Sequence, residues 1–221
     1  MRINQLDLFK TTAIICIAAC ISDFVVLFLL GSYYSGYSQL KNTISSLGAN
    51  VSPVSDLISI WWMFIGIIFI FFGFIFRKAF DKNLKYVRIA SVLIMLYGLG
   101  EGIGSGLFKA DRIAGKMTNS FIIHDIMGGI GIIAALILPL VMLKIMTRKN
   151  APGFYVFSWT IFVIGFITLF LFINNFSYNN IIHFYRGLWQ RLFMLNLYVY
   201  FIAISVVMYH KKSMFYKAKN L

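Results

Sequence analysis

The chain has 221 residues, of which 60% are hydrophobic and only 12% are charged. One soluble core of this size cannot bury so large an apolar fraction, so the composition excludes an ordinary soluble protein and indicates a membrane protein. The formal net charge is +13. In a membrane protein this excess reflects topology and attraction to anionic lipids, so we expect the lipid bilayer, and no nucleic acid, as a partner.

Six apolar segments follow one another along the chain, each close to the ~20 residues that a helix needs to cross the hydrocarbon core. We therefore predict an all-α fold, a single-domain bundle (residues 1–221) of six transmembrane helices. The predicted spans cover residues 12–31, 57–76, 89–108, 121–143, 154–173 and 188–209. The longest connection, residues 32–56, is polar and serine-rich, and its stretch from Gln39 to Gly48 is compatible with a helix.

Four residues of the first two spans have structural interpretations. Cys16 and Cys20 lie one turn apart, and two such cysteines form neither a disulfide framework nor a Cys-rich metal site. The sequence before Cys20 resembles a lipoprotein processing box, but the apolar run continues to Leu30, which favours an uncleaved spanning helix. We expect Trp61 and Trp62 to anchor the second span at the membrane interface.

Basic residues predict the orientation of the bundle, because Lys and Arg near span ends remain on the cytoplasmic side. Alternating loops place 14 of the 20 Lys and Arg on the side of both termini. We therefore expect both termini in the cytoplasm. The six basic residues expected on the outer side are Lys41, Lys109, Arg112, Lys116, Arg186 and Arg191.

Charged residues within the predicted spans are the strongest functional signal. An ionised side chain costs at least ~2.5 kcal/mol at the bilayer centre and needs a partner or water. Asp23 and Glu101 lie in the outer halves of outward-running spans, and His124, Asp125 and Arg191 lie near the outer ends of inward-running spans. We therefore predict that these five line one outward-facing polar pocket. The predicted pocket residues also include Asp111, His183, Arg186 and Ser45.

Glycines at four-residue spacing predict close helix packing, since small residues let helix backbones approach each other in lipid. Gly98, Gly102 and Gly106 share one face of the third span, and further glycines follow Asp125 in the fourth. We expect a tight seam between these two spans that brings Glu101 near Asp125.

The clustered carboxylates cannot all be ionised unless a cation neutralises them. We therefore expect Arg191 to pair directly with Asp125 or Glu101, and His124 to exchange a proton. Such a pocket could bind an anionic or polar head group, whereas the alternative is a buried ion pair that only joins helices. No cofactor or metal is expected, because no two histidines are closely spaced. Zinc, if present, would use His124, His183, Glu101 and Asp111.

Four short motifs occur in order across the six spans. They are Ser-Ser-Leu-Gly at 45–48, Gly-Leu-Phe-Lys-Ala-Asp at 106–111, His124-Asp125, and Gly-Leu-Trp-Gln-Arg at 187–191. The pattern resembles the bacterial and archaeal membrane family catalogued as domain of unknown function 998. Lys109 stands where that family usually has proline, and Asp125 where asparagine is commoner. The resemblance implies a six-helix protein of a prokaryotic cytoplasmic membrane and supports the choice of pocket residues, but it implies no activity.

A second resemblance concerns ceramidase-like membrane hydrolases, because Ser120-Phe-Ile-Ile-His124 is similar to their Ser-x-x-x-His element. Their zinc is held by histidines with a serine and an aspartate, and the paired His-x-x-x-His of their final helix is missing here. We therefore expect, first, a protein that binds or moves a lipid or small polar ligand from the outer side. The alternatives are a membrane-embedded lipid hydrolase and a scaffold that assembles with other membrane proteins. Whether the protein is an enzyme, and its oligomeric state, stay open.

Overall fold

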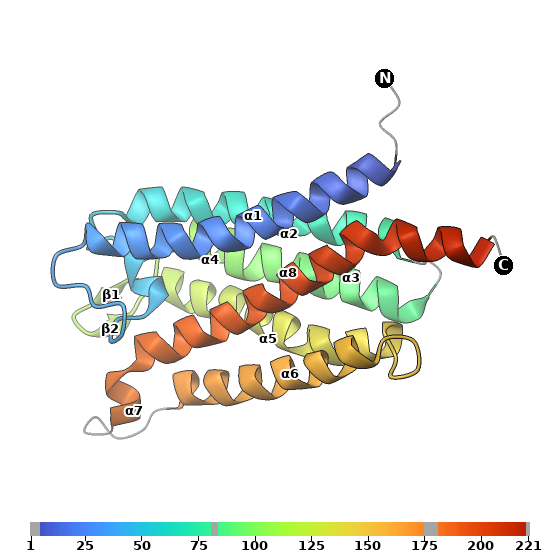
Figure 1. Ribbon diagram of the computed structural model, residues 1–221. Helices are drawn as coiled ribbons and strands as arrows, with labels where there is room; N and C mark the ends of the chain where they lie inside the picture. Colours follow the sequence, from blue (N-terminus) through green and yellow to red (C-terminus); the bar gives the residue numbers. More distant parts are fainter. Residues whose placement is uncertain (1–4, 81–83, 175–180, 220–221) are drawn as a thin grey trace.

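The computed structural model describes residues 5–80, 84–174 and 181–219, which are mostly helical (Figure 1). The third span combines α3 (Lys85–Tyr97), a π-helical segment η2 (Gly98–Gly104) and α4 (Ser105–Leu107). The other helices are α1 (Gln5–Ser32), α2 (Ser55–Ala79), α5 (Asn119–Ile145), α6 (Pro152–Ile173), the short α7 (Ile181–Phe184) and α8 (Arg186–Lys219). Arg2 and Lys82, counted above among the basic residues, lie outside the described residues.

Six helical segments are long and apolar enough to cross a membrane, which confirms the predicted all-α bundle of six spans. Most of them extend a few residues beyond the predicted limits, because polar residues cap and continue the helices. Thr118, for example, caps α5 by accepting a hydrogen bond from the backbone N–H of Phe121 at 3.1 Å. The spans are Leu6–Ser32, Ser55–Ala79, Lys85–Leu107, Asn119–Ile145, Pro152–Ile173 and Arg186–His210.

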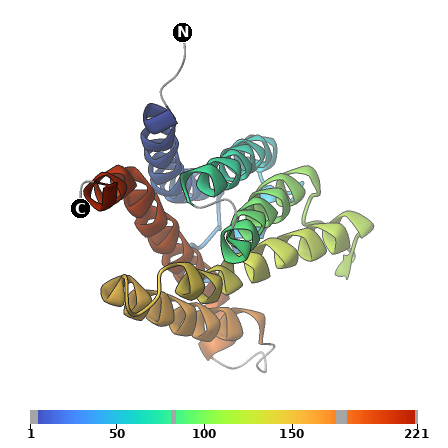
Figure 2. The same ribbon diagram turned by 90° about the vertical axis from the view of Figure 1, so that its right-hand side faces the viewer.

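The spans form a ring in chain order, which Figure 2 shows end-on. Each span packs on the next, and α8 closes the ring by packing on both α6 and α1. Both termini lie at one end of the bundle (Figure 1). The opposite end carries the first long loop with its 3₁₀ helix η1 (Ile44–Gly48), the hairpin of β1 (Arg112–Ile113) and β2 (Lys116–Met117), and α7.

The hairpin between the third and fourth spans is fixed by its turn and by the first loop. Arg112 pairs with Met117 in the antiparallel register. Ala114 and Gly115 both have positive φ, 49° and 77°, as a two-residue type I′ turn requires. Just before β1, the Asp111 carboxylate accepts hydrogen bonds from both the backbone and the side-chain nitrogen of Asn50. The hairpin and the first loop are therefore tied together.

The half of the bundle near the termini has a tightly filled aromatic core. Phe72, Phe76, Tyr200 and Phe201 are fully buried, and the ring centroids of Phe69 and Phe201 lie 4.7 Å apart. Large isoleucine, valine and phenylalanine side chains remain exposed on the outer surfaces of the helices, as expected where a bundle faces lipid.

The glycines of the third span pack on two neighbours. A Cβ on Gly98 would lie 2.5 Å from the carbonyl oxygen of Gly66, so the Gly98 face packs on α2. The predicted tight seam with the fourth span is present, but Gly100 and Gly104 make it instead of Gly98. Residues two apart on a helix, such as Gly98 and Gly100, point in different directions. The other face does meet α5, where a Cβ on Gly131 would lie 2.6 Å from the backbone nitrogen of Glu101.

Candidate functional site

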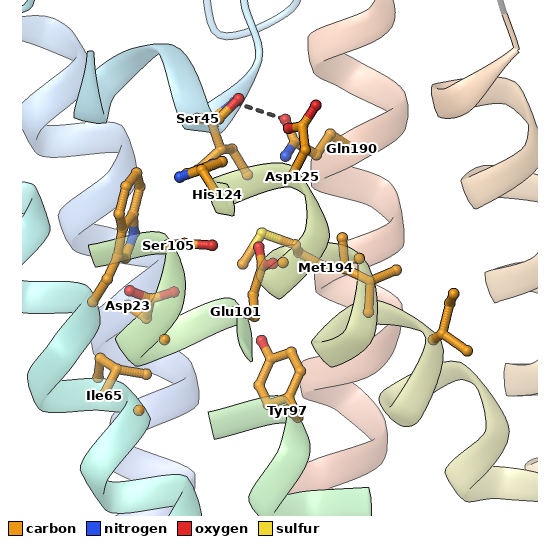
Figure 3. A pocket seen from close by; sticks show the side chains of 18 of the residues that line it. Asp23, Ser45, Ile65, Tyr97, Glu101, Ser105, His124, Asp125, Gln190 and Met194 are labelled. Carbon is orange, nitrogen blue, oxygen red and sulfur yellow. Dashed lines mark hydrogen bonds between the residues drawn. The ribbon is translucent and has the colours of Figure 1, made fainter. Parts of the chain in front are cut away.

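A cavity of about 330 Å³ lies within the ring, in the half of the bundle that carries the first loop. Its floor is aromatic and includes Phe69 and Tyr97, whose ring centroids lie 4.9 Å apart. Six of the predicted pocket residues line it: Arg186 and the five labelled in Figure 3, which are Asp23, Ser45, Glu101, His124 and Asp125. Arg191, Asp111 and His183 are not among its lining residues.

Asp23 is buried in the wall of the cavity with both carboxylate oxygens occupied. Trp61 Nε1 donates to Oδ1 at 2.7 Å, and the Tyr198 hydroxyl donates to Oδ2 at 2.5 Å. Only 1% of Asp23 is exposed. These bonds join α1 to α2 and to α8, so Asp23 holds three spans together. Trp61 is therefore a hydrogen-bond partner within the bundle, and its role as an interfacial anchor stays a prediction.

Glu101 projects into the cavity from the π-helical segment, above the hydroxyl of Tyr97 (Figure 3). A π-helical turn carries an extra residue and is often found at functional positions. Among the described residues, the Glu101 carboxylate makes no hydrogen bond or ion pair. Its oxygen Oε2 lies over Gly128 of α5, where a Cβ would approach it to 3.0 Å. Glycine at this position allows the carboxylate to pack closely against α5.

The outer part of the cavity, nearer than Glu101 to the end that carries the first loop, is lined by His124, Asp125 and Arg186. His124 Nδ1 is 2.8 Å from the carbonyl oxygen of Phe108, so this nitrogen is the donor and carries the proton. Asp125 is exposed and interacts electrostatically with Arg112 and Arg186. The Arg186 Nε donates to the carbonyl oxygen of Phe172 at 3.1 Å. The rim of the cavity therefore carries charges of both signs.

Arg191 does not pair with a carboxylate, so the expected ion pair with Asp125 or Glu101 is wrong. Its nitrogens donate instead to Gln39 Oε1 at 3.0 and 2.7 Å, to the carbonyl oxygens of Asn42 and Gly187 at 2.9 and 3.0 Å, and to the Tyr37 hydroxyl. Every acceptor is neutral, and only 4% of Arg191 is exposed. We call this set of five residues the Arg191 clamp.

The Arg191 clamp fixes the first loop on the start of α8. The Tyr37 hydroxyl accepts from Arg191 and donates to the carbonyl oxygen of Thr43 at 3.2 Å. Burial raises the pKa of Tyr37 although Arg191 acts in the opposite direction, so the hydroxyl keeps its proton for this second bond. Gln190 adds a bond, since its Oε1 accepts from the backbone N–H of Ile44 at 2.7 Å.

One of three comparisons with known proteins found a match. The family described as protein of unknown function (DUF998) matches residues 17–207. The chain belongs to this family. Searches of curated proteins and of solved structures found no match. The likeness to ceramidase-like hydrolases therefore stays a prediction.

In this DUF998 protein, the four motifs occupy neighbouring positions in space. The motif at 187–191 supplies Arg191 and Gln190, which bind the loop that leads into the motif at 45–48. The motif at 106–111 ends at Asp111, which binds Asn50 of the same loop. Most of the motifs thus assemble the end of the bundle around the cavity, and His124-Asp125 lies in the cavity wall.

Lys109 binds polar side chains at the start of α2. Its Nζ donates to Ser55 Oγ at 2.8 Å and Ser59 Oγ at 3.0 Å, and it forms an ion pair with Asp56 at 2.9 Å. Lys109 therefore caps the junction between α4 and the start of α2, and it does so outside the cavity.

The alternative zinc ligands are not gathered at one point. Within residues 5–80, 84–174 and 181–219, no three His, Cys, Asp or Glu side chains are grouped so that they could hold a metal ion. Asp111 binds the first loop, and His183 lies in α7, whereas His124 and Glu101 line the cavity.

The uncharged partners of Asp23 and Arg191 were not predicted from the sequence. Trp61 and Tyr198 hold Asp23, and Tyr37 and Gln39 hold Arg191. One signal was available for α8: Gln190, Met194 and Tyr198, at four-residue spacing, share one helix face and all line the cavity.

Proposed function

We propose that this DUF998 protein binds an amphiphilic ligand, a lipid or another molecule with a polar head and an apolar tail, in the cavity beside Glu101. One observation carries the proposal: the cavity combines a carboxylate that has no hydrogen bond or ion pair among the described residues with a wall of exposed apolar side chains. Ile133 of α5 and Ile173 of α6 line it and are 54% and 57% exposed. A polar end and an apolar end in one cavity suit an amphiphile.

The arrangement of α5 and α6 supports entry from the membrane. The two helices lie close together near the termini and diverge toward the other end in both views (Figures 1 and 2). Side chains of both helices line the cavity where they diverge, including Ile132, Leu169 and Phe172. A lipid tail could therefore stay between these helices while its head reaches Glu101.

The size of the cavity supports a ligand that is only partly enclosed. About 330 Å³ lies at the lower end of the ~300–1,000 Å³ that is usual for small-molecule sites. This volume suits a head group or a short amphiphile, and the two acyl chains of a phospholipid would remain outside, against α5 and α6.

Binding is favoured over the two alternatives. A scaffold would be favoured by a dry ion pair, but Glu101 and Asp125 border a cavity. Serine hydrolysis would need a serine activated by an adjacent base. Among the described residues, the one hydrogen bond of the His124 ring is to the Phe108 carbonyl oxygen.

The proposal includes an orientation in which the termini are cytoplasmic and the cavity lies on the outer side. The distribution of Lys and Arg supports it, because most of them lie at the end of the termini. The test uses single cysteines in a chain whose Cys16 and Cys20 are replaced by serine. A membrane-impermeant thiol reagent added to whole cells should label Ile113→Cys and spare Lys149→Cys. The opposite pattern would invert the orientation.

A binding test uses Gly129, which lines the cavity and has no atom within 4 Å of the position of a Cβ. Gly129→Phe should fill the cavity, whereas Ile130→Phe changes a side chain that is 46% exposed on the same helix and is not in the lining. The delipidated protein is mixed with phosphatidylethanolamine, phosphatidylglycerol, decylamine and decanol, and retained probes are counted by mass spectrometry. The wild type and Ile130→Phe should retain a probe that Gly129→Phe loses. Equal retention of every probe by all three would refute the proposal.

A further inference from the structure

We infer that the head of the ligand carries a protonated amine and that Glu101 binds it. This inference rests on the proposed function and specifies the chemical class of the ligand. It follows from the charges that surround Glu101, from the oxygen atoms that lie beside it, and from the partners of the basic residues at this end of the bundle.

The charged neighbours of Glu101 have the wrong sign to neutralise it. The charges that act on its carboxylate are those of Asp23 and Asp125. Asp23 cannot help by donating a proton to Glu101, because both of its oxygens are occupied by Trp61 and Tyr198. A carboxylate in a low-dielectric interior is costly without a cation or a proton. The interior of this bundle therefore attracts positive charge to Glu101.

Most basic residues at this end of the described chain have other partners, and Lys116 lies on the exposed strand β2 of the hairpin. Arg191 is saturated by neutral acceptors. Lys109 binds Asp56 and two serines. Arg112 and Arg186 act on Asp125, and Lys41 lies 4.3 Å from the ring centroid of Phe184. Among the described residues, none of these cations pairs with Glu101, so a ligand is left to supply the charge.

Two oxygen atoms converge beside Gly128 in a way that suits an ammonium group. A Cβ on Gly128 would lie 3.0 Å from Glu101 Oε2 and 3.2 Å from Ser105 Oγ, so the two oxygens are neighbours at the cavity wall. The Tyr97 hydroxyl points toward Glu101 from below (Figure 3). An ammonium group has three N–H donors and no acceptor, so it can bind a carboxylate and neighbouring hydroxyl oxygens together.

An organic amine fits the cavity better than a bare metal ion. The described residues offer no group of three His, Cys, Asp or Glu side chains for a metal. Beyond Glu101 the lining becomes apolar, with Ile132, Ile133 and Met194. A tail attached to the amine would cover these side chains. The amine could belong to a phospholipid head or to a single-chain amphiphile, and both have the same chemistry at Glu101.

The experiment compares probes that differ only in their heads. Phosphatidylethanolamine and phosphatidylglycerol with identical chains form one pair, and decylamine and decanol form the other. Retention by the delipidated full-length protein is measured for the wild type, Glu101→Gln, Glu101→Asp and Gly129→Phe. The wild type should prefer the amine in at least one pair by about tenfold or more, as expected for a charge-assisted hydrogen bond. Glu101→Gln should lose that preference, and Glu101→Asp should keep part of it.

The outcomes separate the two proposals. Retention that is blocked by Gly129→Phe but shows no amine preference, or is unchanged in Glu101→Gln, would overturn the amine assignment and leave the binding function intact. Retention that Gly129→Phe does not change would overturn both. Preference for phosphatidylethanolamine alone assigns a phospholipid, and preference for decylamine alone assigns a single-chain amine. A folding check by thermal unfolding accompanies each variant, and Glu101→Asp gives the result if Glu101→Gln does not fold.

Discussion

The Arg191 clamp and the cavity around Glu101 lie at the same end of the bundle, yet their hydrogen bonding is opposite. Arg191 donates to four neutral residues, and its guanidinium is almost completely buried. Glu101 faces a cavity and, among the described residues, has neither a hydrogen bond nor an ion pair. The comparison teaches that the depth of a charge in a membrane bundle does not reveal its role. The hydrogen-bond partners of its polar atoms reveal that role, because buried polar groups normally have partners and a missing partner marks a binding position.

The largest effect is expected for Arg191→Leu. The substitution leaves Gln39 Oε1, the Tyr37 hydroxyl and the carbonyl oxygen of Asn42 without their charged donor. Each lost bond to a charged group contributes ~1.5–3 kcal/mol, so the free energy of unfolding should fall by at least ~3 kcal/mol. Thermal unfolding in detergent measures it, with Leu195→Ala on the exposed face of α8 as the control.

A double variant shows whether the clamp or an ion pair explains this loss. Glu101→Gln added to Arg191→Leu should restore nothing, because the two residues do not pair. Recovery of part of the lost stability in the double variant would mean that Arg191 neutralises Glu101. The contrast between a fully bonded Arg191 and an unpaired Glu101 would then be wrong.

Part of this comparison could be predicted from the sequence. The apolar runs predict the six spans, and the depth of Asp23, Glu101, His124 and Asp125 places them near one another, because depth follows from position along a helix. The predicted pairing of Arg191 with a carboxylate is wrong because the depth of a residue does not determine which way its side chain points around the helix axis.

On α8, Gln190, Met194 and Tyr198 face the cavity, whereas Arg191 is one residue, or about 100°, further round and faces the first loop. The loop itself could not be predicted. Its position depends on the bonds of Tyr37, Gln39 and Asn42, and side chains of this kind carry no hydrophobic periodicity.

A smaller effect is expected at the seam that positions Glu101. A Cβ on Gly131 would lie 2.6 Å from the backbone nitrogen of Glu101, so Gly131→Ala must push α5 away from the third span. Overpacking of this kind costs ~1–3 kcal/mol. Gly129→Ala is the matched control, since its Cβ meets nothing within 4 Å and alanine favours a helix. Equal effects of the two alanines would show that the seam is not tight.

Asp23→Asn should lower the free energy of unfolding modestly, in contrast to the substitution of Glu101. The carboxylate accepts from Trp61 and Tyr198, and an amide replaces one of its two acceptor oxygens by a donor. We expect the free energy of unfolding to fall by about 1 kcal/mol, as for one hydrogen bond. Trp61→Phe, which removes one donor and keeps an aromatic ring, should cost a similar amount. Unchanged stability in both variants would mean that Asp23 does not hold the helices together.

Glu101→Gln should have the smallest effect on the stability of the ligand-free protein. Glutamine has nearly the same shape as glutamate, no described residue loses a hydrogen bond, and the repulsion from Asp23 and Asp125 disappears. The free energy of unfolding should therefore stay within ~0.5 kcal/mol of the wild type or rise, as for a substitution that breaks no contact. A fall as large as that of Asp23→Asn would show that the folded protein already supplies Glu101 with a partner.

Stabilisation by a ligand should distinguish Glu101 from the charged residues that only hold the helices together. A molecule that binds only the folded state raises the unfolding temperature. An amine probe retained by the wild type should therefore stabilise the wild type and Asp23→Asn, but not Glu101→Gln. Because Glu101→Gln costs little by itself, loss of this stabilisation cannot be attributed to a damaged fold. Stabilisation of Glu101→Gln to the same extent would place the amine elsewhere, and the carboxylate of Glu101 would then have no role in recognising it.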